Sequence, residues 1–236
     1  MNVAIILAGG HGSRTEQDIP KQFMNVYEKP LIIYTLENFE KNPEIDAIEV
    51  VCLDGWHEVL RAYAKQYHIT KLQWIISGGN DGQESIQKGV EALSDVCGPE
   101  DVVMIHDAIR PMVSEEIISE NIRVCREYGN AITVIPCTAA MLKTYDSLSS
   151  EQQVPRDNLK ITQTPQAFFL KDIIDAHKEA LSKGITNSVA SCTMFIELGR
   201  KLYMSMGSEK NLKLTTAEDI EIFKALLQAK KDEWMH

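Results

Sequence analysis

Short runs of apolar, mostly β-branched residues recur along the chain and alternate with longer amphipathic stretches. Continuous apolar runs are typical of buried strands, and they cover residues 3–6, 47–53, 73–77, 101–105 and 131–136. Between them apolar residues recur at helical spacing, which predicts helices over residues 30–39, 57–67, 85–93 and 114–128. Strands that alternate with helices of this size indicate an α/β fold with a largely parallel sheet and helices on both faces.

The alternation breaks after the fifth apolar run. Residues 137–160 are polar and contain several serines and glutamines around an expected turn. A segment of this length is either a functional or interaction element or a disordered loop, and its pattern leaves both open. Beyond it we expect a last helix capped by Thr215 or Thr216, and the elements predicted there cover residues 170–183 (helix), 188–198 (helix), 201–206 (strand) and 218–230 (helix).

A glycine-rich loop follows the first strand and reads Leu7-Ala8-Gly9-Gly10-His11-Gly12-Ser13-Arg14, with Pro20-Lys21-Gln22 after it. Only glycine lets backbone N–H groups approach a phosphate closely, so such a loop suits a nucleotide site. A dinucleotide-binding turn needs one more glycine, and a Walker loop needs Lys-Ser or Lys-Thr; the chain has neither. A plain turn that ends a strand stays open. Arg14 and Lys21 argue against it, because two gathered cations are costly unless an anion binds.

The composition of the whole chain limits which classes of partner and which compartment are expected. The chain has 236 residues, which suits one α/β domain or a domain with a small appendage. With 24 basic against 34 acidic residues, the net charge of -10 disfavours nucleic acid as a partner. Five cysteines without a C-x-x-C pair argue against a disulfide framework. No apolar stretch reaches about 18 residues, so we expect no membrane span, no targeting segment and a cytoplasmic protein.

A second polar group, His106-Asp107-Ala108-Ile109-Arg110-Pro111, follows the fourth strand. Asp107 is either a turn residue or a ligand for Mg²⁺ opposite the phosphate loop. We expect Arg110 to orient Asp107 by a charge-assisted hydrogen bond, and His106 to pack rather than catalyse. The chain has no motif for a Ser-His-Asp or Cys-His site and no His/Cys spacing for a metal. Cations, glycines and a carboxylate together favour phosphoryl or nucleotidyl transfer.

Taken together, these motifs resemble a known family. They are Leu7-Ala8-Gly9-Gly10-x-Gly12-x-Arg14, Pro20-Lys21-Gln22, Gly78-Gly79 with Ser85 and Gly89, His106-Asp107-Ala108-x-Arg110-Pro111, Arg156, Thr164-Pro165-Gln166 and Asn211-Leu212-Lys213-Leu214-Thr215. They look like the cytidylyltransferases that act on methylerythritol phosphate and ribitol 5-phosphate, and the match covers nearly the whole chain. Glucose-type nucleotidyltransferases share only the first loop.

The resemblance implies a Rossmann-like nucleotidyltransferase fold in one domain over residues 1–236, with residues 137–160 as an arm that pairs two subunits in a homodimer. It also implies CTP as co-substrate and Mg²⁺ as cofactor. The phosphate of a polyol phosphate would attack the α-phosphorus of CTP in line, and pyrophosphate would leave. Arg156 would be donated across the dimer.

The resemblance further assigns roles to individual residues by position. The implied catalytic residues are Arg14, Lys21, Arg156 and Lys213. The implied nucleotide-binding residues are Leu7, Ala8, Gly9, Gly10, Gly12, Gly79, Asn80, Ser85 and Asp107. Asp107 is also the implied metal ligand. The implied acceptor-binding residues are Arg156, Lys213, Ala140 and Thr186.

Three stretches depart from the family pattern. The usual Arg before the serine of the base-binding loop is replaced by Gly82-Gln83-Glu84, the usual Asp-Thr by Ala139-Ala140, and the usual Thr-Asp-Asp-Ala by Thr186-Asn187-Ser188-Val189. The nucleotide half is therefore kept and the acceptor half altered. We expect an active enzyme with a changed acceptor, used in isoprenoid, capsule or cell-wall precursor synthesis. The alternative is a catalytically weakened relative that binds CTP or CDP-polyol as a sensor or partner subunit.

Overall fold

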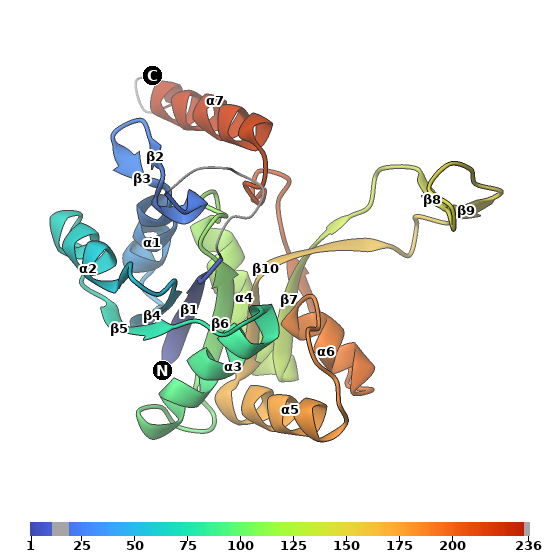
Figure 1. The fold of residues 1–236 in the computed structure, drawn as a ribbon, viewed down its shortest axis with the longest axis horizontal. Coiled ribbons are helices and arrows are strands. Elements are labelled where there is room, and N and C mark those ends of the chain that lie inside the picture. Colours follow the sequence, from blue (N-terminus) through green and yellow to red (C-terminus); the bar gives the residue numbers. More distant parts are fainter. Residues whose placement is uncertain (11–18, 234–236) are drawn as a thin grey trace.

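All five apolar runs predicted as strands lie in one central sheet of the computed structural model, which describes residues 1–10 and 19–233. Among these residues, seven strands follow the order β11-β7-β10-β6-β1-β4-β5 (Figure 1). Their bounds are β1 Asn2–Ala8, β4 Ala47–Cys52, β5 Leu72–Ser77, β6 Val102–Asp107, β7 Asn130–Pro136, β10 Lys160–Phe169 and β11 Met204–Met206. β1 pairs in parallel with β4 and β6, whereas β10 runs antiparallel to β6 and β7. The prediction of a largely parallel sheet is confirmed.

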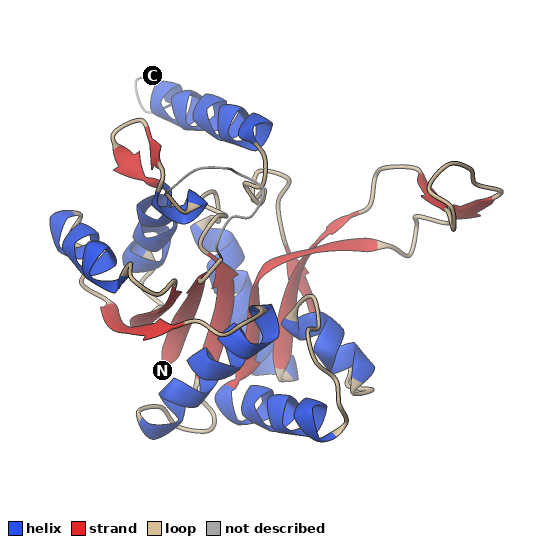
Figure 2. Ribbon diagram, viewed as in Figure 1, coloured by secondary structure: helices blue, strands red, loops and turns tan. Residues whose placement is uncertain are grey.

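Helices cover both faces of the sheet, as predicted (Figure 2). Buried side chains of α1, α2 and α4 pack on one face, and those of α3, α5 and α6 pack on the other. The helices are α1 Leu31–Lys41, α2 His57–Gln66, α3 Gly82–Ala92, α4 Glu115–Tyr128, α5 Leu170–Ser182, α6 Ser191–Glu197 and α7 Ala217–Glu233. Two 3-10 turns, η1 Lys21–Phe23 and η2 Leu93–Asp95, and the short strands β2 Asn25–Val26 and β3 Lys29–Pro30 complete the body in the described ranges. The helices pack on the two faces of the sheet. A ligand site is expected at the carboxyl ends of its parallel strands.

The last helix, α7, packs outside the two helical layers. Phe223 of α7 is fully buried against Val26, Leu31 and Leu214. The hydroxyl of Thr216 accepts the N–H of Asp219 at 3.2 Å, so Thr216 caps α7 as one of the two expected residues. The helix therefore holds the preceding segment, Asn211–Thr215, against the body.

Some element boundaries differ from the prediction. α3 begins at Gly82, earlier than Glu84 or Ser85, because the Asp81 carboxylate caps it by accepting the Glu84 N–H at 2.8 Å. The strand predicted over 201–206 covers only Met204–Met206. The Asn130 side chain donates to the Lys201 carbonyl at 3.0 Å and accepts the Tyr203 N–H at 3.0 Å, which replaces ladder pairing there. α6 begins at Ser191, later than predicted.

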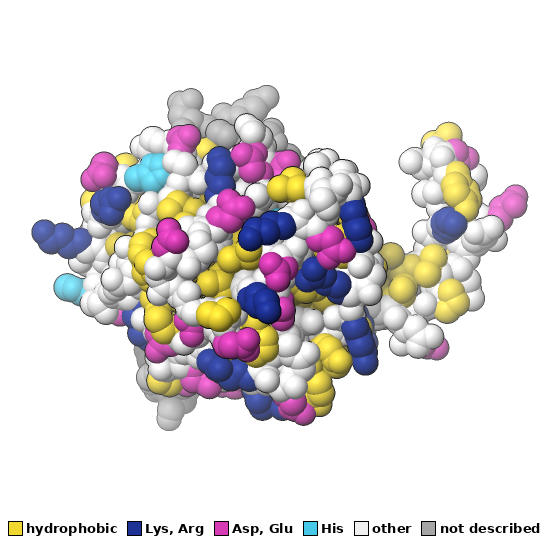
Figure 3. Space-filling model, turned by 90° about the horizontal axis from the view of Figure 1, so that it is seen from below, with side chains coloured by type: hydrophobic (Ala, Val, Ile, Leu, Met, Phe, Trp, Pro, Cys, Tyr) yellow, Lys and Arg dark blue, Asp and Glu magenta, His cyan; other side chains and the backbone are white. Residues whose placement is uncertain are grey.

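Residues 137–160 leave the body as an extended arm (Figure 1). A hairpin of β8 Met141–Lys143 and β9 Gln152–Val154 forms its tip. Most of its side chains are exposed, and the exposed apolar ones include Leu142 at 67%, Tyr145 at 81% and Leu148 at 93% exposure. In Figure 3 the arm projects from the body and shows apolar side chains together with a few charged ones. An ordered arm with exposed apolar residues suits an interaction element better than a disordered loop.

Candidate active site

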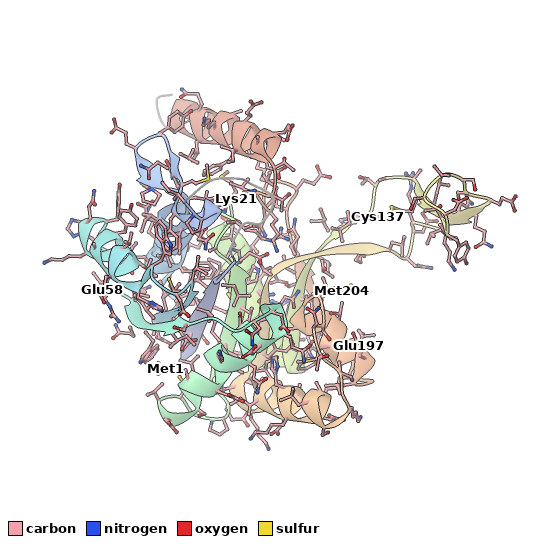
Figure 4. The ribbon with its side chains drawn as sticks, in the orientation of Figure 1. Met1, Lys21, Glu58, Cys137, Glu197 and Met204 are labelled. Atoms are coloured by element: carbon pink, nitrogen blue, oxygen red, sulfur yellow. The ribbon has the colours of Figure 1, made fainter. Side chains whose placement is uncertain are left out.

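The carboxyl ends of β1, β5 and β6 bring the three polar motifs of the sequence together. Gly9 directly follows β1, and Gly78 directly follows β5; a Cβ on Gly9 would lie 3.7 Å from the Gly78 Cα. Two chain segments far apart in sequence therefore lie side by side here, and a Cβ on Gly78 would lie only 3.3 Å from the Ser85 hydroxyl oxygen. Figure 4 places Lys21 above this same edge of the sheet.

The loop after β5 is a closed turn built from its own side chains. The Gly79 N–H donates to the Ser85 hydroxyl at 2.9 Å, and this hydroxyl donates to the Asp81 carbonyl at 2.7 Å. Both the backbone and the side-chain N–H groups of Asn80 donate to the Glu84 carboxylate at 2.7 Å. A Cβ on Gly79 would lie 2.6 Å from the Glu84 side chain. Three predicted nucleotide-binding residues, Gly79, Asn80 and Ser85, are thus brought into one rigid turn.

The end of β1 is braced by Gln22, to which the sequence analysis assigned no role. Gln22 is buried, and its amide donates to the carbonyls of Ala8 at 2.7 Å and Gly10 at 3.0 Å. Buried amides are nearly always hydrogen-bonded, and these two hydrogen bonds let Gln22 fix the start of the glycine loop. The described part of the loop covers Leu7, Ala8, Gly9 and Gly10, whereas Gly12 and Arg14 lie outside the described residues.

Lys21 stands beside Gln22 in η1 and is only 7% exposed. Its ammonium group donates to the backbone carbonyl of Thr215, in the segment just before α7. A cation with so little contact with water needs acceptors close by. The contact therefore joins the glycine-loop side of the site to the segment that carries Lys213.

Asp107 lies at the end of β6 between two cations. Its Oδ2 is 2.9 Å from Arg110 Nε, and its Oδ1 is 3.1 Å from Lys213 Nζ. Burial alone would raise the pKa of Asp107, but Lys213 and Arg110 outweigh it and hold the pKa below its usual value. The expectation that Arg110 orients Asp107 is confirmed, and Lys213 joins the same group from a distant part of the chain.

A neutral frame holds this charged group. His106 is fully buried, its Nδ1 lies 3.2 Å from the Thr164 hydroxyl, and its Nε2 donates to the Arg110 carbonyl at 3.1 Å. Burial lowers the pKa of His106 to about 4, so the ring is neutral near pH 7. The side-chain amide of Asn211 donates to the Thr164 backbone carbonyl at 2.9 Å. The backbone carbonyl of Asn211 accepts from the Arg110 guanidinium at 2.8 Å. His106 packs as expected, whereas the framing roles of Thr164 and Asn211 were missed.

The predicted acceptor-binding residues fall into three places. Lys213 lies on Asp107, as described. Arg156 lies on the arm, where its guanidinium donates to the Thr138 carbonyl, two residues before the exposed Ala140. Thr186 lies exposed in the segment between α5 and α6. Within the described chain, no recorded hydrogen bond or ion pair joins Arg156 or Thr186 to Lys213.

The segment around Thr186 is held by Gln83, a buried residue of α3 that sequence reasoning did not assign to a role. Its amide donates to the Ile185 carbonyl at 2.9 Å and accepts the Ser188 N–H at 2.7 Å. Gln83 directly precedes Glu84 and Ser85 of the nucleotide turn. One residue therefore links that turn to the segment that departs from the family pattern.

The described site combines glycine backbone and buried polar braces with two cations on the Asp107 carboxylate, and Lys21 lies on the Thr215 carbonyl. Such an arrangement can bind a polyphosphate and neutralise charge that develops on it. Among the described residues, no helix is long and apolar enough to cross a membrane.

Comparison with known proteins adds to this geometry. Residues 2–229 match the family IspD, 2-C-methyl-D-erythritol 4-phosphate cytidylyltransferase. The chain is 44% identical to a ribitol-5-phosphate cytidylyltransferase of Lacticaseibacillus paracasei, over 98% of this chain and 100% of that one. It is 36% identical to a 2-C-methyl-D-erythritol 4-phosphate cytidylyltransferase of Clostridium botulinum, over 96% and 97% of the two chains. The fold is similar to the crystal structure of 4-diphosphocytidyl-2C-methyl-D-erythritol synthase from Anaerococcus prevotii, with a TM-score of 0.82, 24% identity and 96% of each chain covered.

Proposed function

The chain belongs to the IspD family of cytidylyltransferases, and on this basis we propose that it transfers the cytidylyl group of CTP to ribitol 5-phosphate. The observation that carries the proposal is the full-length similarity to a ribitol-5-phosphate cytidylyltransferase at 44% identity, against 36% for a methylerythritol phosphate enzyme. The products are CDP-ribitol and pyrophosphate. The charged site on the carboxyl ends of β1 and β6 supports a reaction of phosphate groups.

CTP lies, in this proposal, across the ends of β1 and β5. Backbone groups of Leu7, Ala8, Gly9 and Gly10, together with Gly12, would line the nucleotide. The turn of Gly79, Asn80 and Ser85 would read the edges of cytosine, since it is rigid before the base arrives. Rigid hydrogen-bonding groups discriminate among bases because a wrong base leaves them unpaired.

In the transfer step, a phosphate oxygen of ribitol 5-phosphate attacks the α-phosphorus of CTP as the bond to the bridging oxygen of pyrophosphate breaks. Negative charge grows on the leaving pyrophosphate and on the α-phosphoryl oxygens. Lys21 and Arg14 stabilise this charge, and Lys213 with Arg156 holds the incoming phosphate. Asp107 orients Lys213 through their contact at 3.1 Å.

Mg²⁺ fits the site through Asp107. Magnesium in nucleotide enzymes commonly takes one or two carboxylates together with phosphate oxygens. Asp107 supplies one carboxylate, and among the described residues no group of three acidic, His or Cys side chains forms a separate metal cage. When bound with CTP, the ion would neutralise phosphate charge.

A homodimer would complete the site. The arm carries the exposed apolar residues Leu142, Tyr145 and Leu148, which a second subunit would cover. Arg156 belongs to the arm, which extends away from the body of its own chain (Figure 1), and this supports its donation to the partner's site. The five free thiols and the nucleotide substrate support a cytoplasmic location.

The test is pyrophosphate release from CTP with each of two acceptors, ribitol 5-phosphate and 2-C-methyl-D-erythritol 4-phosphate. We expect turnover with both reactants present and a higher kcat/KM for ribitol 5-phosphate. Higher kcat/KM for methylerythritol phosphate would overturn the choice of acceptor. Measurable CTP binding without turnover on any polyol phosphate would instead support the weakened relative.

A further inference from the structure

One short segment, Asn211–Thr216, carries Lys213 and contacts Lys21. Lys213 lies on Asp107, and the Thr215 carbonyl accepts the ammonium group of Lys21. The segment is fixed at Leu214, which is fully buried and donates its N–H to the Ile109 carbonyl at 2.9 Å. The position of the Thr215 carbonyl therefore decides where Lys21 rests.

That carbonyl belongs to a stretch held by Asp219, a residue of the first turn of α7. A single oxygen, Asp219 Oδ2, accepts the Thr215 N–H at 2.6 Å, the Thr215 hydroxyl at 2.9 Å and the Thr216 N–H at 2.7 Å. Asp219 returns its own N–H to the Thr216 hydroxyl at 3.2 Å. Burial opposes ionisation of Asp219, but the hydrogen bonds from Thr216 and Thr215 outweigh it and lower its pKa.

We propose that Asp219 is a positioning residue for Lys21: it fixes the Thr215 backbone so that its carbonyl holds the Lys21 ammonium group toward the nucleotide. The proposal rests on the function proposed above, in which Lys21 stabilises the charge of the transferring phosphates. Asp219 acts through two steps, from its carboxylate to the Thr215–Thr216 backbone and from the Thr215 carbonyl to Lys21. It has no contact with substrate in this proposal.

The reasoning is geometric. An ammonium group has three N–H donors, and an anchored acceptor for one of them limits the directions of the other two. Lys21 is 7% exposed, so an anchor replaces the water that would otherwise surround it. Without Asp219, residues 215 and 216 lose three hydrogen bonds and the anchor becomes mobile. Lys21 would then be ordered only on encountering the triphosphate, at a cost in the rate of transfer.

Removal of Asp219 should leave the fold in place. α7 stays docked through Phe223, which is fully buried, and Leu214 keeps the segment on the body. Because only one oxygen of Asp219 accepts the three donors, the amide oxygen of Asn can take its place. Asp219→Asn is therefore the conservative variant, and Asp219→Ala is the disruptive one. Glu221→Ala changes an exposed acid of the same helix and serves as the matched control.

The first measurement is steady-state turnover of the full chain with CTP and ribitol 5-phosphate. We expect Asp219→Ala to lower kcat by about 10- to 100-fold with the KM for CTP changed less than about 3-fold. Asp219→Asn should recover most of the rate, and Glu221→Ala should match wild type. In a Lys21→Ala background, Asp219→Ala should lower kcat by less than about a further 2-fold. Both changes remove the same contribution, the positioned ammonium group of Lys21. Independent, multiplying losses would overturn the proposal.

A second readout does not depend on turnover. Acylation of lysines by an amine reagent, followed by mass spectrometry, should label Lys21 faster in Asp219→Ala than in wild type, whereas the exposed Lys224 should label equally in both. Equal labelling of Lys21 would overturn the positioning role. If wild type transfers no cytidylyl group, the proposed function fails, and this labelling still decides whether Asp219 holds Lys21.

Discussion

A buried carboxyl group under α3 predicts that the fold loses stability as the pH rises. Glu49 of β4 is fully buried, and neither of its carboxyl oxygens has a hydrogen-bond partner among the described residues. Burial raises the pKa of Glu49 from 4.5 to about 8. Between these values the unfolded chain releases a proton that the folded chain keeps, so the free energy of unfolding falls by about 1.4 kcal/mol per pH unit.

Glu49→Gln removes this titration and leaves a neutral group of the same size. From pH 6 to pH 8.5, the free energy of unfolding of wild type should fall by about 2.5 kcal/mol relative to the variant, because the raised pKa flattens the loss only above about 8. This is a large share of a typical stability of about 5–15 kcal/mol. The interval also avoids the isoelectric point near 5.1, where low net charge favours association.

The assay is urea unfolding of both proteins at the two pH values, with linear extrapolation and a check that the slopes agree. Any constant cost of burying the Gln amide cancels, since it is the same at both pH values. The control for the change from carboxylate to amide is Glu58→Gln on α2, at a side chain that is 88% exposed. A difference between Glu49→Gln and wild type that stays constant from pH 6 to pH 8.5 would refute a neutral, buried Glu49.

Three further changes probe the site. Lys21→Ala should lower kcat by about 10²- to 10³-fold while the melting temperature stays near wild type, and unchanged turnover would remove its transition-state role. Gly79→Ala should raise the KM for CTP, because its Cβ would lie 2.6 Å from the neighbouring Glu84 side chain; Gly82→Ala, with nothing within 4 Å, is the control and should bind CTP normally. Mixing Lys21→Ala with Arg156→Ala subunits should restore about a quarter of wild-type turnover, since half of the dimers then hold one intact site. No recovery, with heterodimers verified, would contradict donation of Arg156 across the dimer.

The layers of the fold could be predicted because continuous apolar runs and helical spacing are local properties. The strand β10 was not predicted, and the structure gives the physical reason. Its first residues extend into the arm and are exposed, its last residues are buried in the sheet, and Pro165 interrupts the ladder where the register shifts between Thr162 and Gln166. One strand with two environments shows neither the alternation nor the continuous apolar run that predicts strands.

The site shows the same division. Glycines after a strand, and Asp107 close to Arg110, could be read from neighbouring residues. The contact of Asp107 with Lys213, 106 residues away, follows from topology; the family resemblance named both residues for the site but did not predict that they pair. The amides of Gln22, Gln83 and Asn211 could not be assigned from sequence, because a buried amide takes its role from the backbone groups that surround it.

We propose that this chain forms CDP-ribitol at the site between Lys21 and Lys213. The decisive measurement is to incubate the protein with CTP and equal amounts of ribitol 5-phosphate and 2-C-methyl-D-erythritol 4-phosphate. The products are then identified by mass spectrometry. We expect CDP-ribitol as the main product, one pyrophosphate for each molecule formed, and loss of both in Lys21→Ala. CTP that stays intact with either acceptor, or the methylerythritol derivative as main product, would contradict it.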